Sequence, residues 1–357
     1  RSLKCLTLRP SRSRSKQNKR RQNMEKEIIL SVKDLEVKFK LRGKTLHAIR
    51  KVSLDIYKGE VVAIVGESGS GKSVFTKNFL GLLDSNGYID GGSIMYDGKD
   101  LAKLSQKKWE KAGIRGKEIA MIMQDPMTSL NPLKSIGDQI AEAILLHRKV
   151  SKAQAKLEAL NCLRDVEIGD VERRYKQYPH EFSGGMRQRV VIAMAIACNP
   201  KILICDEPTT ALDVTIQAQV LKLIKNLKEK YNLTVVFITH DLGVVANIAD
   251  RVAVMYAGDI VEIGNSEEIF YEAKHPYTKA LLRSLPNIAE KGTDLHSIKG
   301  TPPSLFGEIV GDAFAPRNPE ALNIDYLETP PYFEVSPTHK AKTWLLDPRY
   351  KAHNEES

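Results

Sequence analysis

The sequence has few cysteines and no long apolar segment. Its four cysteines, Cys5, Cys162, Cys198 and Cys205, show neither the CxxC spacing of a metal or redox motif nor a ladder of disulfide partners. We therefore expect reduced, buried thiols in a cytosolic protein. The longest uninterrupted apolar run covers residues 190–198, which is far too short to cross a bilayer. The chain is not predicted to span a membrane, and its first residues lack the apolar region of a secretory signal.

Acidic residues are missing from the start of the chain. Residues 1–23 contain nine Lys or Arg and no Asp or Glu, and removing these nine charges from the total of +10 leaves +1 for residues 24–357. The net charge therefore gives little support for nucleic acid as a partner of the main part of the chain. We expect residues 1–23 to be a disordered leader or a mis-called start. The alternative is an arm that binds nucleic acid or a lipid surface.

The rest of the chain alternates strand-like and helix-like segments, and its length accommodates one large α/β domain with an appendage or two ordinary domains. Residues 29–39 and 48–56 alternate apolar and polar side chains, as expected for an antiparallel edge sheet. Residues 138–200 have a helical pattern, and regularity is lost after residue 286. Continuous apolar runs typical of buried parallel strands cover residues 60–66, 201–205 and 234–239.

A glycine-rich turn follows the first buried strand. It reads GESGSGKS and fits the pattern GxxxxGK[ST]. Its glycines allow backbone N–H groups to surround phosphate oxygens, and the start of the next helix adds partial positive charge. Lys72 would reach the terminal phosphates and Ser73 would hold Mg²⁺. The predicted nucleotide-binding residues are Gly66, Glu67, Ser68, Gly69, Ser70, Gly71, Lys72 and Ser73.

Two further buried strands end in groups suited to phosphoryl transfer, which needs Mg²⁺ coordination and a group that orients the attacking water. Asp206 is placed to support Mg²⁺ and Glu207 to act as the general base, because both follow the apolar run at residues 201–205. His240 ends the next such run, where an imidazole can donate to a γ-phosphate. The alternatives are two solvated acids and a structural histidine.

A second helix start on the same chain has the features of an anion-binding site. Ser183, Gly184, Gly185 and Met186 open a strongly apolar helix, VVIAMAIA. The free backbone N–H groups and the dipole at such a helix start favour a phosphate. The alternative is a flexible turn in which Ser183 is an ordinary N-cap.

These motifs, in this order, resemble the ATP-binding-cassette ATPases over about residues 28–265. The resemblance implies an α/β P-loop NTPase cassette with a parallel core sheet, an antiparallel edge sheet, a helical signature subdomain and an irregular C-terminal extension. It also implies a head-to-tail pair of cassettes, in which residues 183–186 act on ATP held by the partner's P-loop. The matching residues are the P-loop, Gln124 in MIMQDP, the FSGGM signature, the ILICDE strand end, the ALD at residues 211–213 and His240.

The resemblance assigns roles to two more residues. Gln124 would act in catalysis and on Mg²⁺, and Asp213 would belong to the nucleotide site. The aromatic residue that stacks on adenine in this family is not evident upstream of the P-loop, where residues 41–48 offer only His47.

Two segments are similar to the peptide-importer branch of the family, and in particular to the ATP-binding subunits of oligopeptide permeases: QDPMTSLNP at residues 124–132 and HPYTKALLRSLP at 275–286. The resemblance implies an ATPase that powers oligopeptide uptake, peripheral to the cytoplasmic face of the cell membrane. Its partners would be a second homologous ATPase subunit, two transmembrane permease subunits and an extracellular peptide-binding protein, with no nucleic acid. The alternatives are a cassette ATPase for dipeptide- or nickel-type substrates and a nucleic-acid-associated ATPase, although the chain has neither tandem cassettes nor a long coiled-coil insertion.

We expect a leader at residues 1–23, a cassette at 24–270 with its helical subdomain at about 138–185, and an extension at 271–357. In this branch the extension often carries four cysteines that hold an iron–sulfur cluster. Here Asp312, Asn318, Asp325 and a residue near Thr343 stand at those positions, and no cysteine follows Cys205. Because such clusters need thiolate ligands, the expected cofactors are ATP and Mg²⁺, without an iron–sulfur cluster.

The extension is expected to be structural and to dock the two ATPases. Its aromatic residues are denser than disordered segments usually allow. We predict that the side chains that pack on the cassette or its partner are Phe314, Tyr326, Tyr332, Phe333 and Trp344.

Overall fold

The computed structural model describes residues 27–210, 212–284 and 298–350. The predicted leader at residues 1–23 lies outside these ranges, as does Cys5. The three cysteines in the described ranges, Cys162, Cys198 and Cys205, are free and buried, as predicted. No helix within these ranges is both long and apolar enough to cross a membrane.

A mixed sheet of eight strands forms the centre of the molecule, in the order β11-β12-β10-β9-β3-β8-β7-β6. Its middle is parallel, and its five parallel strands are β6 (Ile119–Ile122), β7 (Ile202–Asp206), β8 (Thr234–Thr239), β3 (Val61–Val65) and β9 (Arg251–Tyr256). The predicted buried strands at residues 60–66, 201–205 and 234–239 are confirmed as β3, β7 and β8. Residues of β3, β7 and β8 are buried on both faces, which explains their continuous apolar runs.

A second sheet is antiparallel and has four strands in the order β2-β1-β4-β5. The strands are β1 (Ile28–Leu41), β2 (Lys44–Tyr57), β4 (Gly87–Tyr96) and β5 (Lys99–Asp100). This sheet confirms the expected antiparallel segment, but β1 and β2 extend to a tight hairpin at residues 42–43, beyond the predicted ends. Its buried face packs on α2 (Lys72–Lys77) and on one face of the large sheet.

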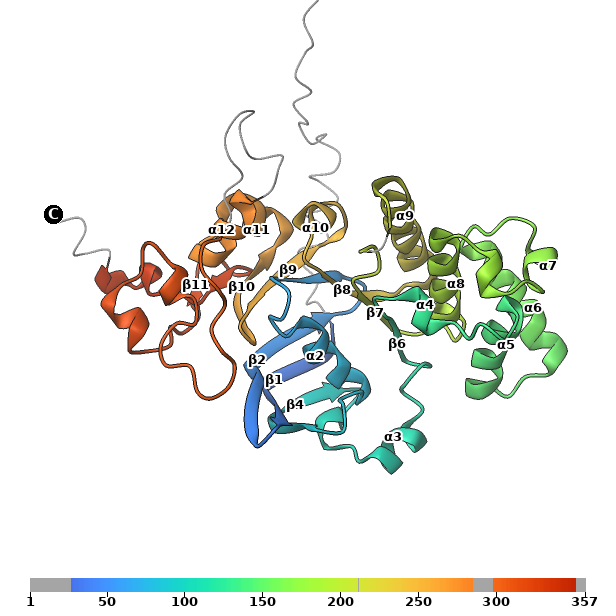
Figure 1. Cartoon of the computed structure of the whole chain (residues 1–357), viewed down its shortest axis with the longest axis horizontal. Helices are drawn as coiled ribbons and strands as arrows, with labels where there is room; N and C mark the ends of the chain where they lie inside the picture. The colour runs from blue at the N-terminus through green and yellow to red at the C-terminus, as the bar shows by residue number, and fades with distance from the viewer. Residues whose placement is uncertain (1–26, 211, 285–297, 351–357) are drawn as a thin grey trace, which may run out of the picture.

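Helices cover the opposite face of the large sheet (Figure 1). They are α9 (Val214–Tyr231), α10 (Leu242–Ile248), α11 (Ser266–Glu272) and α12 (Pro276–Arg283). The remaining short helices are α3 (Gln106–Ala112) and α4 (Pro126–Ser129). Short 3-10 turns lie at Asn78–Leu80, Leu101–Lys103, Pro179–Glu181, Ala315–Arg317, Asn323–Tyr326 and Trp344–Leu346.

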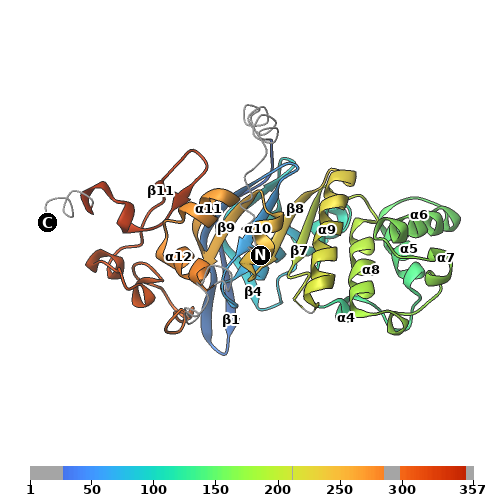
Figure 2. The ribbon, with the colours of Figure 1, turned by 90° about the horizontal axis from the view of Figure 1, so that it is seen from above.

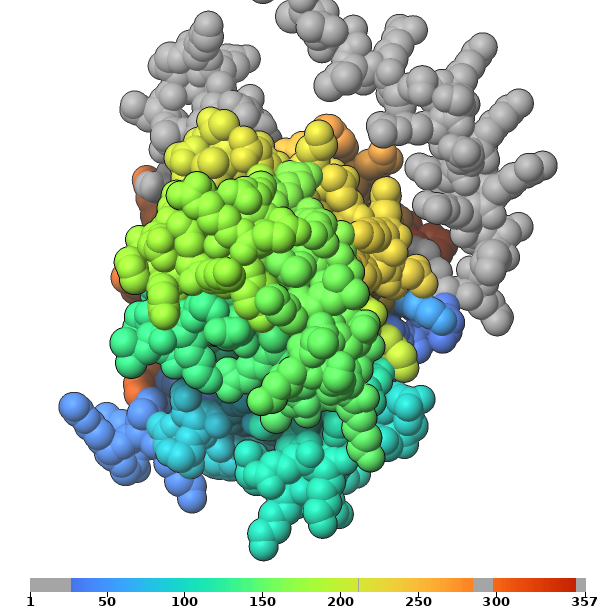
Figure 3. Space-filling view, turned by 90° about the vertical axis from the view of Figure 1, so that its right-hand side faces the viewer, coloured from blue at the N-terminus to red at the C-terminus, as the bar shows by residue number. Residues whose placement is uncertain are grey.

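The helical part and the C-terminal extension lie at opposite ends of the long axis, as Figures 1 and 2 both show. The helical part consists of α5 (Ile136–His147), α6 (Lys152–Asp165), α7 (Val171–Arg174) and α8 (Gly184–Ile196). These helices share one apolar cluster with α9 and the edge of the large sheet. Seen from that end, they cover most of the visible face, and the segment around α3 protrudes below them (Figure 3).

The extension is joined to the large sheet by main-chain pairing. Strand β12 (Lys340–Ala341) pairs with β10 (Asp259–Asn265), and β11 (Phe333–Glu334) pairs with β12. The hydroxyl of Tyr332 donates to the carbonyl of Ile260 at 2.6 Å. The extension therefore continues the cassette's own sheet.

The predicted aromatic residues of the extension have different roles. Phe314 is buried against Tyr256 and Tyr277 of the preceding part of the chain, with ring centroids 5.4 and 5.3 Å away. Phe333 and Trp344 contact each other within the extension, at 6.0 Å. Tyr326 is 52% exposed, and its hydroxyl donates within the extension, to Ala315. Contact with the cassette is thus observed for Phe314 and Tyr332.

Short polar side chains stand at the four positions that correspond to the cluster-binding cysteines. Each accepts a hydrogen bond from a nearby backbone N–H group. Asp312 accepts from Phe314, Asn318 from Glu320, Asp325 from Leu322 and Thr343 from Leu345. All four side chains are buried. Here these positions fix turns through side-chain oxygens.

Candidate functional site

The P-loop connects β3 to α2 in a conformation that requires glycine. Gly66 has φ +154°, and a Cβ atom there would lie 2.0 Å from the carbonyl oxygen of Met255. Gly71 has φ +103°, and a Cβ atom there would lie 2.9 Å from the carbonyl oxygen of Ala48. Because both glycines are packed against backbone, the turn cannot accept larger residues without moving β2 or β9.

Lys72 is buried at the start of α2 and points back into the turn. Its ammonium donates to the carbonyls of Gly66 and Glu67, at 2.8 and 2.9 Å. Burial lowers the pKa of Lys72, and the charges of nearby acids oppose this effect. The hydroxyl of Ser70 is also buried and has no hydrogen-bond partner in the part of the chain that the structure describes. A buried cation and an unpaired hydroxyl in one turn suit an anionic oxygen ligand.

Asp206, at the end of β7, lies opposite Ser73. Its Oδ1 atom accepts a hydrogen bond from the Ser73 hydroxyl at 2.8 Å. Burial raises the pKa of the Asp206 carboxyl, and the charge of Glu207 adds to this effect, whereas the Ser73 hydrogen bond opposes it. A buried carboxylate and a hydroxyl are the hard oxygen donors that Mg²⁺ prefers, so this pair fits the predicted ion.

Three side chains hold the carboxylate of Glu207. Its Oε2 atom accepts hydrogen bonds from Gln124 Nε2 and Thr210 Oγ1, both at 3.0 Å. Its Oε1 atom lies 3.2 Å from His240 Nδ1. The structure therefore brings together Gln124, Glu207 and His240, which come from three separate strand ends. Sequence reasoning missed Thr210, although it stands only three residues after Glu207.

These groups line one pocket of about 860 Å³. Its polar wall includes the P-loop, Gln124, Glu207, Thr210 and His240. Its apolar lining includes Phe39, Leu41, Leu46, Leu281 and Leu305, here called the apolar wall. One pocket thus combines the predicted phosphate-binding turn with apolar side chains.

The apolar wall differs from the sequence-based expectation. His47, the only candidate found for contact with a base, is not among the described residues that line the pocket. Phe39 and Leu46 line it instead, because β1 and β2 extend toward their hairpin and bring both side chains to the P-loop. The alternation of apolar residues continuing through Leu41 was the signal that could have identified this wall.

The signature residues lie elsewhere. Ser183 caps α8, with its Oγ atom accepting from the backbone N–H of Met186 at 3.4 Å. Gly185 packs against α9, where an added Cβ atom would lie 2.6 Å from Ile216. None of the described residues that line the P-loop pocket belongs to residues 183–186. Within one chain, the two predicted phosphate-binding helix starts do not share a site.

Asp213 is also an N-cap. Its Oδ1 atom accepts from the backbone N–H groups of Thr215 and Ile216 at the start of α9, both at 3.0 Å. It does not line the P-loop pocket among the described residues, and Ala211 lies outside the described ranges. The predicted role of Asp213 in nucleotide binding is therefore not a feature of the single chain's pocket.

The extension contacts the P-loop directly. Arg317 donates two hydrogen bonds to the carboxylate of Glu67, at 2.8 and 3.0 Å. The hydroxyl of Tyr277, in α12, accepts from the backbone N–H of Glu67 at 2.8 Å. No local sequence pattern indicates these contacts, because Glu67 and Arg317 are 250 residues apart.

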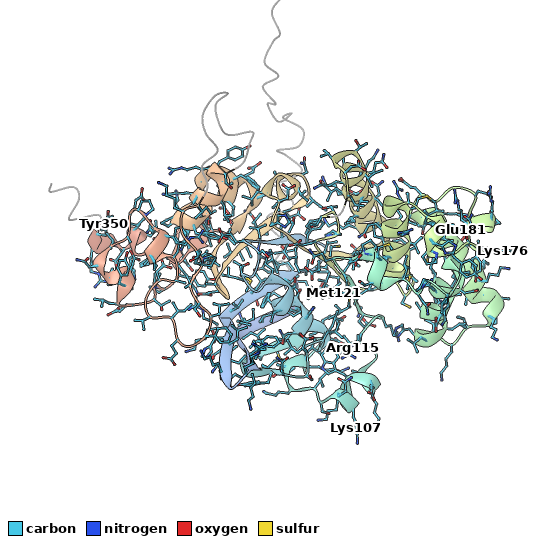
Figure 4. The ribbon with its side chains drawn as sticks, in the orientation of Figure 1. Lys107, Arg115, Met121, Lys176, Glu181 and Tyr350 are labelled. Atoms are coloured by element: carbon cyan, nitrogen blue, oxygen red, sulfur yellow. The ribbon has the colours of Figure 1, made fainter. Side chains whose placement is uncertain are left out.

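A second hollow of about 450 Å³ lies between the helical part and the region of β6 and the 3-10 turn at Asn78–Leu80. Arg115 and Met121, which line it, are labelled near the middle of Figure 4, whereas Lys176 and Glu181 lie at the far end of the helical part. Met123, Thr128, Ser129 and Ala143 also line it. Gln124 lines the P-loop pocket, and Thr128 and Ser129, which follow it closely in the chain, line this hollow.

Comparison with known proteins matches two family models. Residues 49–210 match the model described as ABC transporter, and residues 261–324 match the model of the oligopeptide/dipeptide transporter C-terminal region. The chain is 58% identical over 323 residues to the oligopeptide transport ATP-binding protein AmiE of Streptococcus pneumoniae, covering 90% of each chain. It is 56% identical over 322 residues to the oligopeptide transport ATP-binding protein OppD of Bacillus subtilis, covering 90% of this chain and 89% of that protein.

Among solved structures, a dimeric post-hydrolysis state of the ATP-binding cassette MJ0796 bound to ADP and Pi is similar, with a TM-score of 0.59 and 28% identity. The match covers 66% of this chain and 98% of the MJ0796 chain. The predicted fold class is confirmed by this similarity and by the observed sheets.

Proposed function

The chain belongs to the ABC transporters, as an ATP-binding subunit of the oligopeptide/dipeptide importer group, and from this premise we propose how its residues couple ATP hydrolysis to peptide uptake. The protein is an ATPase of an oligopeptide importer. The observation that carries the proposed mechanism is the carboxylate of Glu207, which three side chains hold beside the P-loop in one pocket.

The P-loop would bind the phosphates of ATP, and the apolar wall would contact the base. Lys72 would exchange its two backbone acceptors for phosphate oxygens, which costs little because the charge is already buried at this position. Ser73, Asp206 and Gln124 would hold Mg²⁺, which neutralises charge on the phosphates. Phe39 and Leu46 would offer the base an apolar surface that includes one aromatic ring.

Glu207 is proposed as the general base. Its carboxylate can accept a proton from the attacking water, because it lies on the pocket wall beside the P-loop. Gln124 and Thr210 fix its Oε2 atom, and His240 approaches its Oε1 atom. His240 would also donate to the γ-phosphate, as predicted from its place at a strand end.

A second cassette would complete the site. The signature residues 183–186 do not line the pocket of their own chain, which supports their action on ATP in a partner subunit. The dimeric state named for MJ0796 supports such a pair. The partner here would be a second homologous ATPase, with Asp213 contributing near the interface.

Coupling to the membrane subunits would use residues 125–137 and the hollow beside them. Met127 and Leu133 in this segment are exposed, Leu133 by 85%. Exposed apolar side chains next to a hollow are typical of a protein contact. Two transmembrane permease subunits would dock here, the chain would lie at the cytoplasmic face of the membrane, and an extracellular peptide-binding protein would deliver the substrate.

The test is uptake by the purified complex in proteoliposomes. A labelled series from dipeptides to longer oligopeptides should be imported only with ATP, with preference for oligopeptides. Preference for dipeptides would favour the alternative substrate class, and ATP hydrolysis without any peptide uptake would contradict the proposal.

A further inference from the structure

The extension holds the first variable residue of the P-loop from two sides. Arg317 forms a two-pronged ion pair with the side chain of Glu67, and Tyr277 accepts from its backbone N–H. The side chain of Arg317 is 5% exposed and that of Glu67 is 27% exposed. Such a paired, largely buried geometry is more specific than an ordinary surface ion pair.

Arg317 is itself fixed by further contacts with the extension and with β9 of the cassette. Its Nε atom donates to the carbonyl of Lys299 at 3.0 Å, and its guanidinium donates to the hydroxyl of Tyr256 at 3.2 Å. The guanidinium also lies over the rings of Tyr256 and Phe314, 5.8 and 5.9 Å from their centroids. The position of Arg317 therefore depends on the folded extension.

Glu67 also contacts Lys72, the predicted phosphate-binding lysine. In the chain without ATP, the carbonyl of Glu67 accepts from Lys72 Nζ at 2.9 Å, so the backbone fixed by Tyr277 and Arg317 also holds Lys72 at the site before ATP binds. On the base side, the carbonyl of Leu305 accepts from the backbone N–H of His47 at 2.8 Å, and Leu305 lines the pocket. The extension thus meets the pocket at two separate points.

The negative charge of Glu67 affects ATP binding. A carboxylate at the entrance of a phosphate site repels an anionic ligand unless a cation neutralises it. The hydrogen bonds to Glu67 raise the pKa of Arg317, so the guanidinium stays charged throughout the working pH range. Loss of Arg317 would leave Glu67 unpaired beside the phosphates and free to move.

We propose that Arg317 is a positioning residue for ATP, which neutralises Glu67 and holds the P-loop so that nucleotide binding and folding of the extension stabilise each other. The inference rests on the proposed function, because it concerns the same ATP pocket. By thermodynamic linkage, the free energy that the folded extension adds to ATP binding equals the free energy that bound ATP adds to the stability of the extension.

The test is ATP binding to the full chain, with ATP itself as the ligand. Arg317→Ala should weaken binding about tenfold, within the usual range for coupling between two sites. Arg317→Lys, which keeps the charge but not the fork, should lose less. In Glu67→Gln/Arg317→Ala the loss should be smaller than in Arg317→Ala, because the unpaired charge is gone. In the assembled transporter, Arg317→Ala should raise KM for ATP more than it lowers kcat.

The matched control is Arg349→Ala, since Arg349 also pairs with an aspartate in the extension but its side chain is 78% exposed. It should bind ATP as the unchanged chain does. A drop in thermal stability of Arg317→Ala with ATP affinity within twofold of the unchanged chain would overturn the inference and leave Arg317 with a structural role alone. Should Arg317→Ala not fold, an unchanged affinity in Arg317→Lys would overturn it equally. Failure of the unchanged chain to bind ATP would instead overturn the proposed function.

Discussion

The hydroxyl of Ser73 lies 2.8 Å from the Oδ1 atom of Asp206, which joins the P-loop to the end of a strand 133 residues away. Asp206 is buried, and burial raises its pKa. The pair combines the two oxygen donors that an Mg²⁺ site at the phosphates needs. Burial of an ionised carboxylate at this position lowers the stability of the folded chain.

Asp206→Asn should remove the stability cost of the buried charge and also impair ATP hydrolysis. A carboxyl with a raised pKa in the folded protein favours folding below its unfolded pKa, and this advantage is lost as the pH rises through the folded value. Without nucleotide, the variant should therefore gain thermal stability relative to the unchanged chain as the pH rises from 4 to 8, while Mg²⁺-dependent ATP hydrolysis falls at least about a hundredfold. Asp90→Asn, at an exposed ion pair, is the control. A variant with normal Mg²⁺-dependent hydrolysis would exclude Asp206 from the ion site.

Ser183→Arg should act only in the assembled pair. Because Ser183 lies outside its own chain's pocket, ATP binding to the isolated chain should change less than twofold, whereas hydrolysis and transport by the complex should fall more than tenfold. Ser151→Arg removes an equivalent N-cap, on α6, and controls for the loss of a cap. Loss of ATP affinity in isolated Ser183→Arg would count against the head-to-tail arrangement.

Thr210→Ala should lower kcat by about threefold to tenfold with little change in KM for ATP, because it removes one of the groups that orient Glu207. Thr210→Ser keeps the hydroxyl and should restore most of the rate. Steady-state ATPase measurements on the complex decide this. Equal rates for Thr210→Ala and the unchanged protein would remove Thr210 from the site.

Sequence motifs located the polar half of the pocket, and the structure explains why they could. The P-loop and Asp206–Glu207 are short contiguous segments whose spacing follows from a strand and a turn. His240 was placed correctly at a strand end because parallel strands finish at one edge of the sheet.

The other half depends on where strands end and on contacts between distant parts of the chain. Phe39 is the last residue of the predicted first strand, and Leu46 reaches the pocket because β2 begins at Lys44, before the predicted residues 48–56. The pairing of Glu67 with Arg317 depends on how the extension folds back over the cassette. The extension was expected to be irregular, yet two of its short strands join the central sheet through β10.

Anaerobically purified protein should show no visible-range absorbance of an iron–sulfur cluster and no iron or sulfide in proportion to the protein. The physical reason is the absence of thiols after Cys205, since cluster binding needs thiolates. The oxygens of Asp312, Asn318 and Asp325 already accept backbone hydrogen bonds. Cluster absorbance with matching iron and sulfide would contradict this prediction.

The central claim is that Glu207 takes the proton from the attacking water and that this reaction drives uptake. The most direct measurement is ATP binding, ATP hydrolysis and peptide uptake by complexes that carry Glu207→Gln, with Glu172→Gln, at an exposed ion pair, as the control. We predict that Glu207→Gln binds ATP normally, that hydrolysis falls at least about a hundredfold, and that uptake falls to background. Near-normal hydrolysis and uptake by this variant would contradict the account.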